Sequence, residues 1–137
     1  AGAIPYYADV TVIDIWGIND RWVARHGDWV SDQPRHARYA PWEYLLSRDV
    51  HLLIGQPLIV PVDLDLDFVL DIAGYEVFHV SLADPGLLPP DARMLEVPLG
   101  KTHKAYILYL NPHPRIDALI QAGDWKAYPI QRSGQPG

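Results

Sequence analysis

Residues 1–26 read AGAIPYYADVTVIDIWGINDRWVARH, and this stretch predicts a strand, a tight turn, a second strand and the start of a capped helix. Residues 10–15 are apolar and rich in β-branched side chains, as in a buried strand. Gly17 then breaks the chain, and Asn19 or Asp20 supplies an N-cap for the helix that follows. A strand end and a helix start are therefore expected to lie side by side.

Polar side chains gather where this strand is expected to end. Open α/β sheets usually bind their ligands beyond the carboxyl ends of the strands, which is where Asp14 is placed. We therefore predict that five polar side chains lie in one region of the fold: Asp14, Asn19, Asp20, Arg25 and His36. The alternative is purely structural, with Asp14 capping a turn and Asn19 beginning a helix.

The same stretch carries three short motifs: G-A-I-P-Y-Y at residues 2–7, V-I-D-I-W-G-I-N-D at residues 12–20 and V-A-R-H at residues 23–26. Together they resemble a pattern in bacterial polytopic membrane glycosyltransferases that use polyprenyl-phosphate sugars, such as the actinobacterial arabinofuranosyl- and mannosyltransferases. That pattern is roughly G-x-I-P-Y-Y, then I-D-x-x-G-L-x-D, then I-A-R-H, and Ile18 stands where it has Leu. The matching positions are Gly2, Ile4, Pro5, Tyr6, Tyr7, Ile13, Asp14, Gly17, Asp20, Ala24, Arg25 and His26.

Such glycosyltransferases carry a soluble domain outside the cytoplasmic membrane and keep the catalytic carboxylate on a loop among their transmembrane helices. The resemblance, which covers roughly residues 1–60, implies that this chain is that extracytoplasmic C-terminal domain and holds no catalytic residue. Its implied partners are the transmembrane domain of the full-length protein and either a cell-envelope glycan or a polyprenyl-phosphate sugar. Aromatic faces stack on sugar rings and polar side chains bind hydroxyls. The expected ligand-binding residues are Tyr6, Tyr7, Asp14, Asn19, Asp20, Arg25, His26, Trp29 and His36.

Composition sets broader bounds. The 137 residues, 49% of them hydrophobic, are enough for one domain, which we place at residues 1–131 with a loose tail at 132–137. The absence of cysteine excludes disulfides and thiolate metal sites. No apolar run reaches the ~20 residues that a membrane-spanning helix needs. The net charge of −6 argues against a nucleic-acid partner. The chain begins with Ala, which fits a segment of a longer protein.

Aromatic and arginine side chains concentrate in the first third of the chain, which has nearly balanced charge, whereas residues 49–101 are acidic. A segment of this composition is typical of a binding surface. Trp22 and Trp42, on predicted helices, are expected to fill the core. Trp29 lies in residues 27–40, which show no period and predict a long loop on the glycan- or membrane-facing surface.

The remaining segments predict a mixture of strands and helices without strict alternation. Helices are expected at 41–48 and 114–123, with Gly123 at the C-cap and Ile116, Leu119 and Ile120 as the buried stripe. Strands are expected at 51–54, 75–82, 94–97, 105–110 and 125–130, the fourth of them central and the first ended by Gly55 and Pro57. The predicted fold class is α/β or α+β, a single domain with a mixed β-sheet and helices packed on its faces.

Residues 58–61 are expected to be a connection or an edge segment, and residues 62–68 allow two predictions. The strict alternation fits a strand with three exposed aspartates, but a helix is favoured, with Phe68, Val69 and Ile72 as its buried stripe. The aspartates also resemble the start of an EF-hand loop, but Phe68 and Gly74 stand where that loop needs Gly and Glu.

No nucleophile elbow, phosphate-binding loop, dinucleotide fingerprint or zinc-protease motif occurs, and we expect neither a metal nor a cofactor. Two other functions remain open. A small independent hydrolase would use Asp14 with His26 or His36, because a carboxylate that orients an imidazole is a common catalytic element. A zinc site built from His26, His36 and an aspartate is a related alternative. The third function is a protein-interaction or assembly domain without a small ligand.

Overall fold

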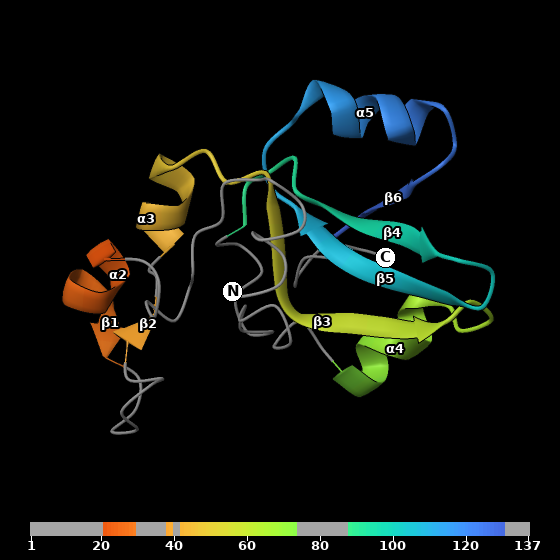
Figure 1. Cartoon of the computed structure of the whole chain (residues 1–137), viewed down its shortest axis with the longest axis horizontal. Helices are drawn as coiled ribbons and strands as arrows, with labels where there is room; N and C mark the ends of the chain where they lie inside the picture. Colours follow the sequence, from red (N-terminus) through yellow and green to blue (C-terminus); the bar gives the residue numbers. More distant parts are fainter. Residues whose placement is uncertain (1–20, 30–37, 40–41, 74–87, 131–137) are drawn as a thin grey trace. The chain divides into compact units, whose positions relative to one another are not determined.

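A computed structural model of the chain describes residues 21–29, 38–39, 42–73 and 88–130 (Figure 1). Its internal contacts divide the chain into two units, residues 1–48 and 49–137, and each unit is described by itself. The predicted strands at 10–15 and 75–82 lie outside the described residues. The boundary of a single domain at residue 131 stays a prediction.

Within its described residues, the first unit contains two short helices, α2 (Arg21–His26) and α3 (Trp42–Ser47), as the cap and proline signals predict. Between them, β1 (Asp28–Trp29) pairs antiparallel with β2 (Arg38–Tyr39). The prediction of an uninterrupted loop at 27–40 is therefore wrong at both of its ends. Strands of two residues are too short to show the alternation of apolar and polar residues from which a strand is predicted.

The described part of the second unit is built on a sheet of four strands: β3 (Leu52–Pro61), β4 (Arg93–Leu99), β5 (His103–Tyr109) and β6 (Lys126–Pro129). The strand order is β3-β5-β4-β6, so β5 is internal, as its apolar sequence predicts. Two helices accompany the sheet, α4 (Leu66–Ala73) and α5 (Pro114–Gln121). The predicted combination of a sheet with helices is confirmed. Every strand pair described is antiparallel, which selects the α+β alternative and not a mixed sheet.

Strand β3 runs through the two residues that were expected to end it. Its register with β5 shifts between Leu53 and Leu58, so the segment holding Gly55 and Pro57 forms an irregularity within one edge strand. Figure 1 shows β3 bending sharply along its length. Glycine and proline locally favour the end of a strand, but the strand continues because β3 pairs with β5 on both sides of the shift.

Helix α4 confirms the helical alternative for the aspartate-rich segment. The Asp65 carboxylate accepts a hydrogen bond from the Phe68 backbone N–H at 2.8 Å, which is an N-cap that sets the helix start at Leu66. Val69 is buried, as predicted, but Phe68 is 49% exposed, so its assignment to the buried stripe is wrong.

The two faces of the sheet bury different kinds of residues. On one face an apolar cluster forms between β4, β5 and α5, made by Leu95, Val97, Tyr109 and Ile116. The opposite face carries Met94, Tyr106 and Leu108, which are 1%, 0% and 0% exposed. Glu96 and Lys104 lie on that second face, because residues alternate along each strand. A polar pair therefore sits in the middle of an otherwise apolar surface.

Helix α5 begins with a histidine cap. The His113 side chain accepts a hydrogen bond from the Arg115 backbone N–H through Nδ1 at 3.2 Å, and Pro114 occupies the first turn. At the other end the C-cap is Ala122, one position earlier than predicted, and Gly123 follows it with φ of +80°. Ile116 is buried, whereas Leu119 and Ile120 are half-buried.

Loss of this cap has a measurable cost. We expect His113→Ala to lower the free energy of unfolding by about 1 kcal/mol, because one N–H of the first turn loses its acceptor. His113→Asn supplies a replacement oxygen and should recover most of the loss. Arg115→Ala, an exposed change in the same turn, is the control. Urea unfolding of the three variants measures the effect, and equal stability of His113→Ala and wild type would contradict the capping role.

None of the helices within the described residues is both long enough and apolar enough to cross a membrane.

Candidate functional site

Helix α2 exposes a continuous stripe of cationic and aromatic side chains. Arg21, Arg25 and His26 are exposed, and Trp22 between them is 40% exposed. Arg21 and Arg25 are one helical turn apart, as are Trp22 and His26, so the two pairs run side by side along the helix. Arg25 and His26 also lie in the last turn, where positive charge complements the helix dipole.

Trp22 is held by an aromatic stack with α3. Its ring lies 4.1 Å from that of Tyr44, centroid to centroid, with only 8° between the planes. The His26 ring is 5.2 Å from the indole and tilted by 32°. Its Nδ1 is 3.3 Å from the Trp22 carbonyl oxygen. Because Tyr44 is 8% exposed, it forms the inner support on which the exposed indole rests.

Arg48 completes the set from the end of α3. Its guanidinium carbon lies 5.8 Å from the centre of the Tyr44 ring, and its Nη1 donates to the Tyr44 hydroxyl at 3.3 Å. The Ser47 hydroxyl donates to the Tyr44 carbonyl at 2.7 Å. We call Arg21, Trp22, Arg25, His26 and Arg48, with Tyr44 beneath them, the α2–α3 surface. It offers guanidinium donors around one supported aromatic ring.

The α2–α3 surface contains two of the nine residues predicted to bind ligand, Arg25 and His26. Trp29 lies in β1, paired with Arg38, and its side chain is outside the description. The other six predicted residues lie outside the described residues: Tyr6, Tyr7, Asp14, Asn19, Asp20 and His36. The prediction of a common site, and the pairing of Asp14 with a histidine, both stay predictions.

Trp22 corrects one prediction. It was expected to fill the core because it lies on a helix, yet 40% of it is exposed. The sequence does carry a signal that points outward: Arg21 and Arg25 flank Trp22 on a six-residue helix, which leaves little apolar surface to bury. The side chain of Trp42 is outside the description.

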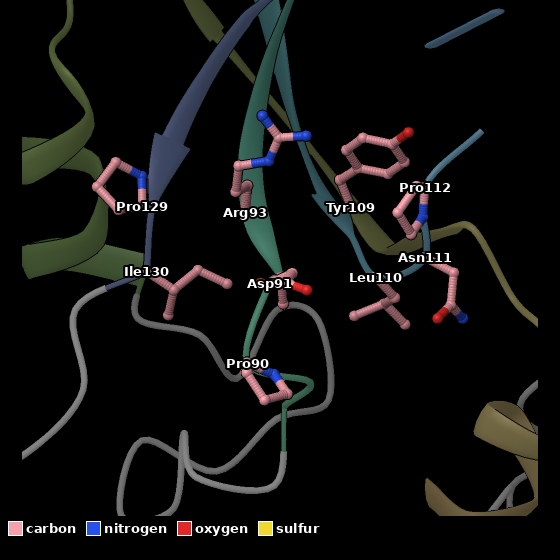
Figure 2. A pocket seen from close by; sticks show the side chains of 10 residues that line it. Pro90, Asp91, Arg93, Tyr109, Leu110, Asn111, Pro112, Pro129 and Ile130 are labelled. Atoms are coloured by element: carbon pink, nitrogen blue, oxygen red, sulfur yellow. The ribbon is translucent and has the colours of Figure 1, made fainter. Parts of the chain in front are cut away.

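The second unit carries a pocket of about 560 Å³ where β4 begins and β5 and β6 end, and we call it the strand-end pocket (Figure 2). Its apolar wall comes from residues that include Pro90, Leu110 and Ile130. Its polar groups are Asp91, Arg93, Tyr109 and Asn111. The Asn111 amide has a structural role, because its Nδ2 donates a hydrogen bond to the Val50 carbonyl at 2.7 Å.

Tyr109 is the centre of a hydrogen-bond network beside this pocket. Its hydroxyl accepts from the His113 backbone N–H at 2.6 Å and donates to Asp117 Oδ1 at 2.8 Å. The Arg93 guanidinium lies 5.3 Å from the centre of the Tyr109 ring and 3.7 Å from the same Asp117 oxygen. Burial raises the pKa of Tyr109, and the Asp117 carboxylate adds to that rise against the opposing His113 hydrogen bond.

This network connects the start of α5 to the sheet. Because its pKa is raised, the Tyr109 hydroxyl stays protonated and acts as a structural hydrogen-bond donor. The Arg93 side chain, 39% exposed, supplies the positive charge among the residues that line the pocket (Figure 2). Sequence reasoning did not identify Arg93, Tyr109 or Asp117. The sequence does carry one signal for this network. The most apolar strand contains a tyrosine close to the turn that follows it, and a buried tyrosine hydroxyl needs a hydrogen-bond partner.

Within the described residues, no group of three or more histidine or acidic side chains is placed to hold a metal ion. Asp65, a residue of the calcium alternative, instead caps α4. Among the described histidines, the rings of His51 and His113 meet edge to face at 4.9 Å. His51 Nδ1 lies 3.2 Å from the Asn111 carbonyl, and His113 Nδ1 accepts from Arg115, so each histidine has one nitrogen in a backbone contact.

Comparisons with curated proteins and with solved structures give no match to this chain. A family model does match, over residues 1–109, which include both helices of the α2–α3 surface and the sheet as far as the end of β5. The chain therefore belongs to the family described as "Domain of unknown function (DUF8728)".

Proposed function

We propose that this chain is the accessory extracytoplasmic domain of an integral-membrane glycosyltransferase that builds a cell-envelope polysaccharide. In this proposal the α2–α3 surface contacts the glycan acceptor near the membrane active site, and transmembrane helices elsewhere in the full-length protein supply catalysis. Support comes from the resemblance of the motifs in residues 2–26 to such enzymes and from the chemistry of the α2–α3 surface.

The exposed ring of Trp22 is the observation that carries the proposal. Trp22, a residue that is 40% exposed and whose indole stacks parallel to the Tyr44 ring, offers a supported apolar surface. The C–H face of a sugar ring stacks on such a surface, while Arg21 and Arg25 donate to hydroxyl groups. A single stacked ring contributes about 1 kcal/mol, so the affinity for one or two sugar units should be millimolar at best.

The same surface suits one other ligand of this reaction. Arg21 and Arg25 are both exposed and one helical turn apart, a spacing that allows two guanidinium groups to meet one phosphate. A polyprenyl-phosphate sugar donor therefore competes with the glycan acceptor as the occupant of the α2–α3 surface.

Titration of the 137-residue chain with arabinan and mannan fragments tests the proposal. We expect shifts of the indole N–H signal of Trp22 and of the amide signals of Arg21–His26, with Kd in the millimolar range. Trp22→Ala should weaken binding about fivefold, because loss of ~1 kcal/mol corresponds to that factor. Its melting temperature should change little, since the ring is substantially exposed.

Ile59→Ala is the control, because it removes a large apolar side chain of similar exposure from β3 in the other unit. Binding should be unchanged in that variant. If neither glycan shifts the α2 signals at saturation, the acceptor role is wrong. A response to micellar polyprenyl phosphate that is lost in Arg25→Ala, and kept in Trp22→Ala, would assign the surface to the donor.

A further inference from the structure

A second pocket, of about 520 Å³, lies in the second unit on the face of the sheet opposite α5, and we call it the α4 pocket. One side is formed by the connection from β3 to α4 and by α4 itself, through Leu64, Leu66 and Leu70. The other side is formed by β4, β5 and β6, through Glu96, Lys104 and Lys126. Its volume falls within the range of small-molecule sites.

The sheet side of the α4 pocket is a largely buried, hydrogen-bonded polar array. Glu96 Oε1 accepts from Lys104 Nζ at 3.0 Å and from the Tyr106 hydroxyl at 3.0 Å. The side chains of Glu96 and Lys104 are only 15% and 10% exposed, and Tyr106 is completely buried. The strand register fixes the array, because Glu96 lies directly opposite Tyr106 on β5 and Lys126 on β6.

Both charges of this pair persist across the neutral range. Burial alone raises the pKa of Glu96, but the hydrogen bonds from Lys104 and Tyr106 and the nearby ammonium groups outweigh it and lower the pKa overall. Burial alone lowers the pKa of Lys104, yet Tyr106 and Glu96 raise it overall. The pair therefore presents fixed donors and acceptors and does not supply a proton donor or base near pH 7.

Hydrogen-bonding capacity remains at the rim of the pocket. Glu96 Oε2 faces the Lys126 ammonium at 3.9 Å, beyond hydrogen-bond distance, and Lys126 is 68% exposed. Tyr128 adds a half-buried aromatic ring from the same strand, and the leucines supply an apolar wall opposite. At the mouth, Asp63 and Asp67 are exposed, and Asp65 is already engaged as the cap of α4.

We propose that the α4 pocket binds one neutral sugar residue, as a second glycan subsite. Glu96 Oε2 accepts from a sugar hydroxyl, Lys126 donates to another, and Tyr128 with the leucines covers the C–H face of the ring. A neutral ligand fits because Glu96 and Lys104 already neutralise each other, whereas exposed aspartates at the mouth disfavour a phosphate. This subsite rests on the proposed glycan-binding function, but it uses residues that the α2–α3 surface does not contain.

The test is an NMR titration of the 137-residue chain with methyl mannopyranoside and methyl arabinofuranoside. We expect amide shifts at residues 62–70 and at Glu96, Lys104, Lys126 and Tyr128. Lys126→Ala should weaken binding about two- to tenfold, the range for one lost hydrogen bond. It should leave the fold intact because the Lys104–Glu96 pair is untouched. Lys101→Ala removes an exposed ammonium from the β4–β5 turn and should leave binding unchanged.

Three results would overturn this subsite: no shift at residues 62–70 at saturation, equal weakening by Lys101→Ala and Lys126→Ala, or tighter binding of glucosamine or inorganic phosphate than of the neutral glycosides. The two glycan proposals fail separately. Shifts in the α4 pocket without shifts at Arg21–His26 contradict the α2–α3 surface alone. Shifts at Arg21–His26 without shifts in the pocket contradict the subsite alone.

Discussion

Glu96→Ala should lower the free energy of unfolding by about 3–5 kcal/mol, because it leaves the Lys104 ammonium buried without a counter-charge. The Lys104 side chain is 10% exposed, and its ammonium forms an ion pair with Glu96 at 3.0 Å. The Tyr106 hydroxyl, which also donates to Glu96, would lose its acceptor in the same variant. Urea unfolding, followed by circular dichroism, measures the loss.

The double variant Glu96→Leu with Lys104→Met is the informative control. Replacement of a buried ion pair by apolar groups of similar size is often neutral or stabilising, so this variant should be much more stable than Glu96→Ala. A loss below about 1 kcal/mol in Glu96→Ala would show that water reaches Lys104 and that the pair is not buried.

The pair also predicts how stability depends on pH. The pKa of Glu96 is lowered in the folded state, so its contribution is present above its ordinary value of 4.5 and is lost as the pH falls through the folded-state pKa. The pKa of Lys104 is raised, so its contribution is present below its ordinary value of 10.5 and is lost as the pH rises through the folded-state pKa. The double variant should lack both of these components in a series of urea midpoints.

Leu95→Ala should destabilise the second unit by about 3–5 kcal/mol, since Leu95 is completely buried and a cavity would remain in the cluster beneath α5. Thermal unfolding measures the effect as a fall in Tm. Leu99→Ala is a matched control, because Leu99 lies on the same strand and the same face but is 42% exposed. That control should change stability by no more than about 0.5 kcal/mol.

The comparison of Leu95 with Leu99 separates burial from strand propensity. If both substitutions cost the same, the loss reflects the preference of leucine over alanine in a strand, and the packing against α5 is weaker than its contacts indicate. A large cost at Leu95 with none at Leu99 would establish that the cluster beneath α5 holds the sheet together.

The sequence predicts secondary structure correctly where a single residue type, such as proline, determines the local backbone conformation. Pro41 and the apolar spacing after it predict α3, and Ala73-Gly74, a plausible helix end, favours α4 over a strand. Signals failed where a neighbouring strand decides the outcome. Gly55 and Pro57 suggested the end of a strand, but β5 pairs with β3 on both sides of them.

The candidate sites show the same contrast between features set by neighbouring residues in the sequence and features set by strand pairing. Arg25 and His26 were identified because they belong to a contiguous motif, and the structure places both on the exposed side of α2. Glu96 was not identified, because a single acid in a short strand predicts a solvent-facing side chain. Its buried partner Lys104 lies eight residues away and meets it only through the pairing of β4 with β5.

The bend in β3 has a consequence for self-association. An exposed edge strand is a template on which another chain can add a strand and begin to aggregate. Among the described strands β3 lies at an edge of the sheet, but the shift between Leu53 and Leu58 divides it, and Pro57 and Pro61 carry no N–H to offer a neighbour. An incoming strand would find only short stretches of regular backbone. The irregularity at Gly55 and Pro57, where the sequence predicts the end of the strand, thus protects β3 from uncontrolled polymerisation.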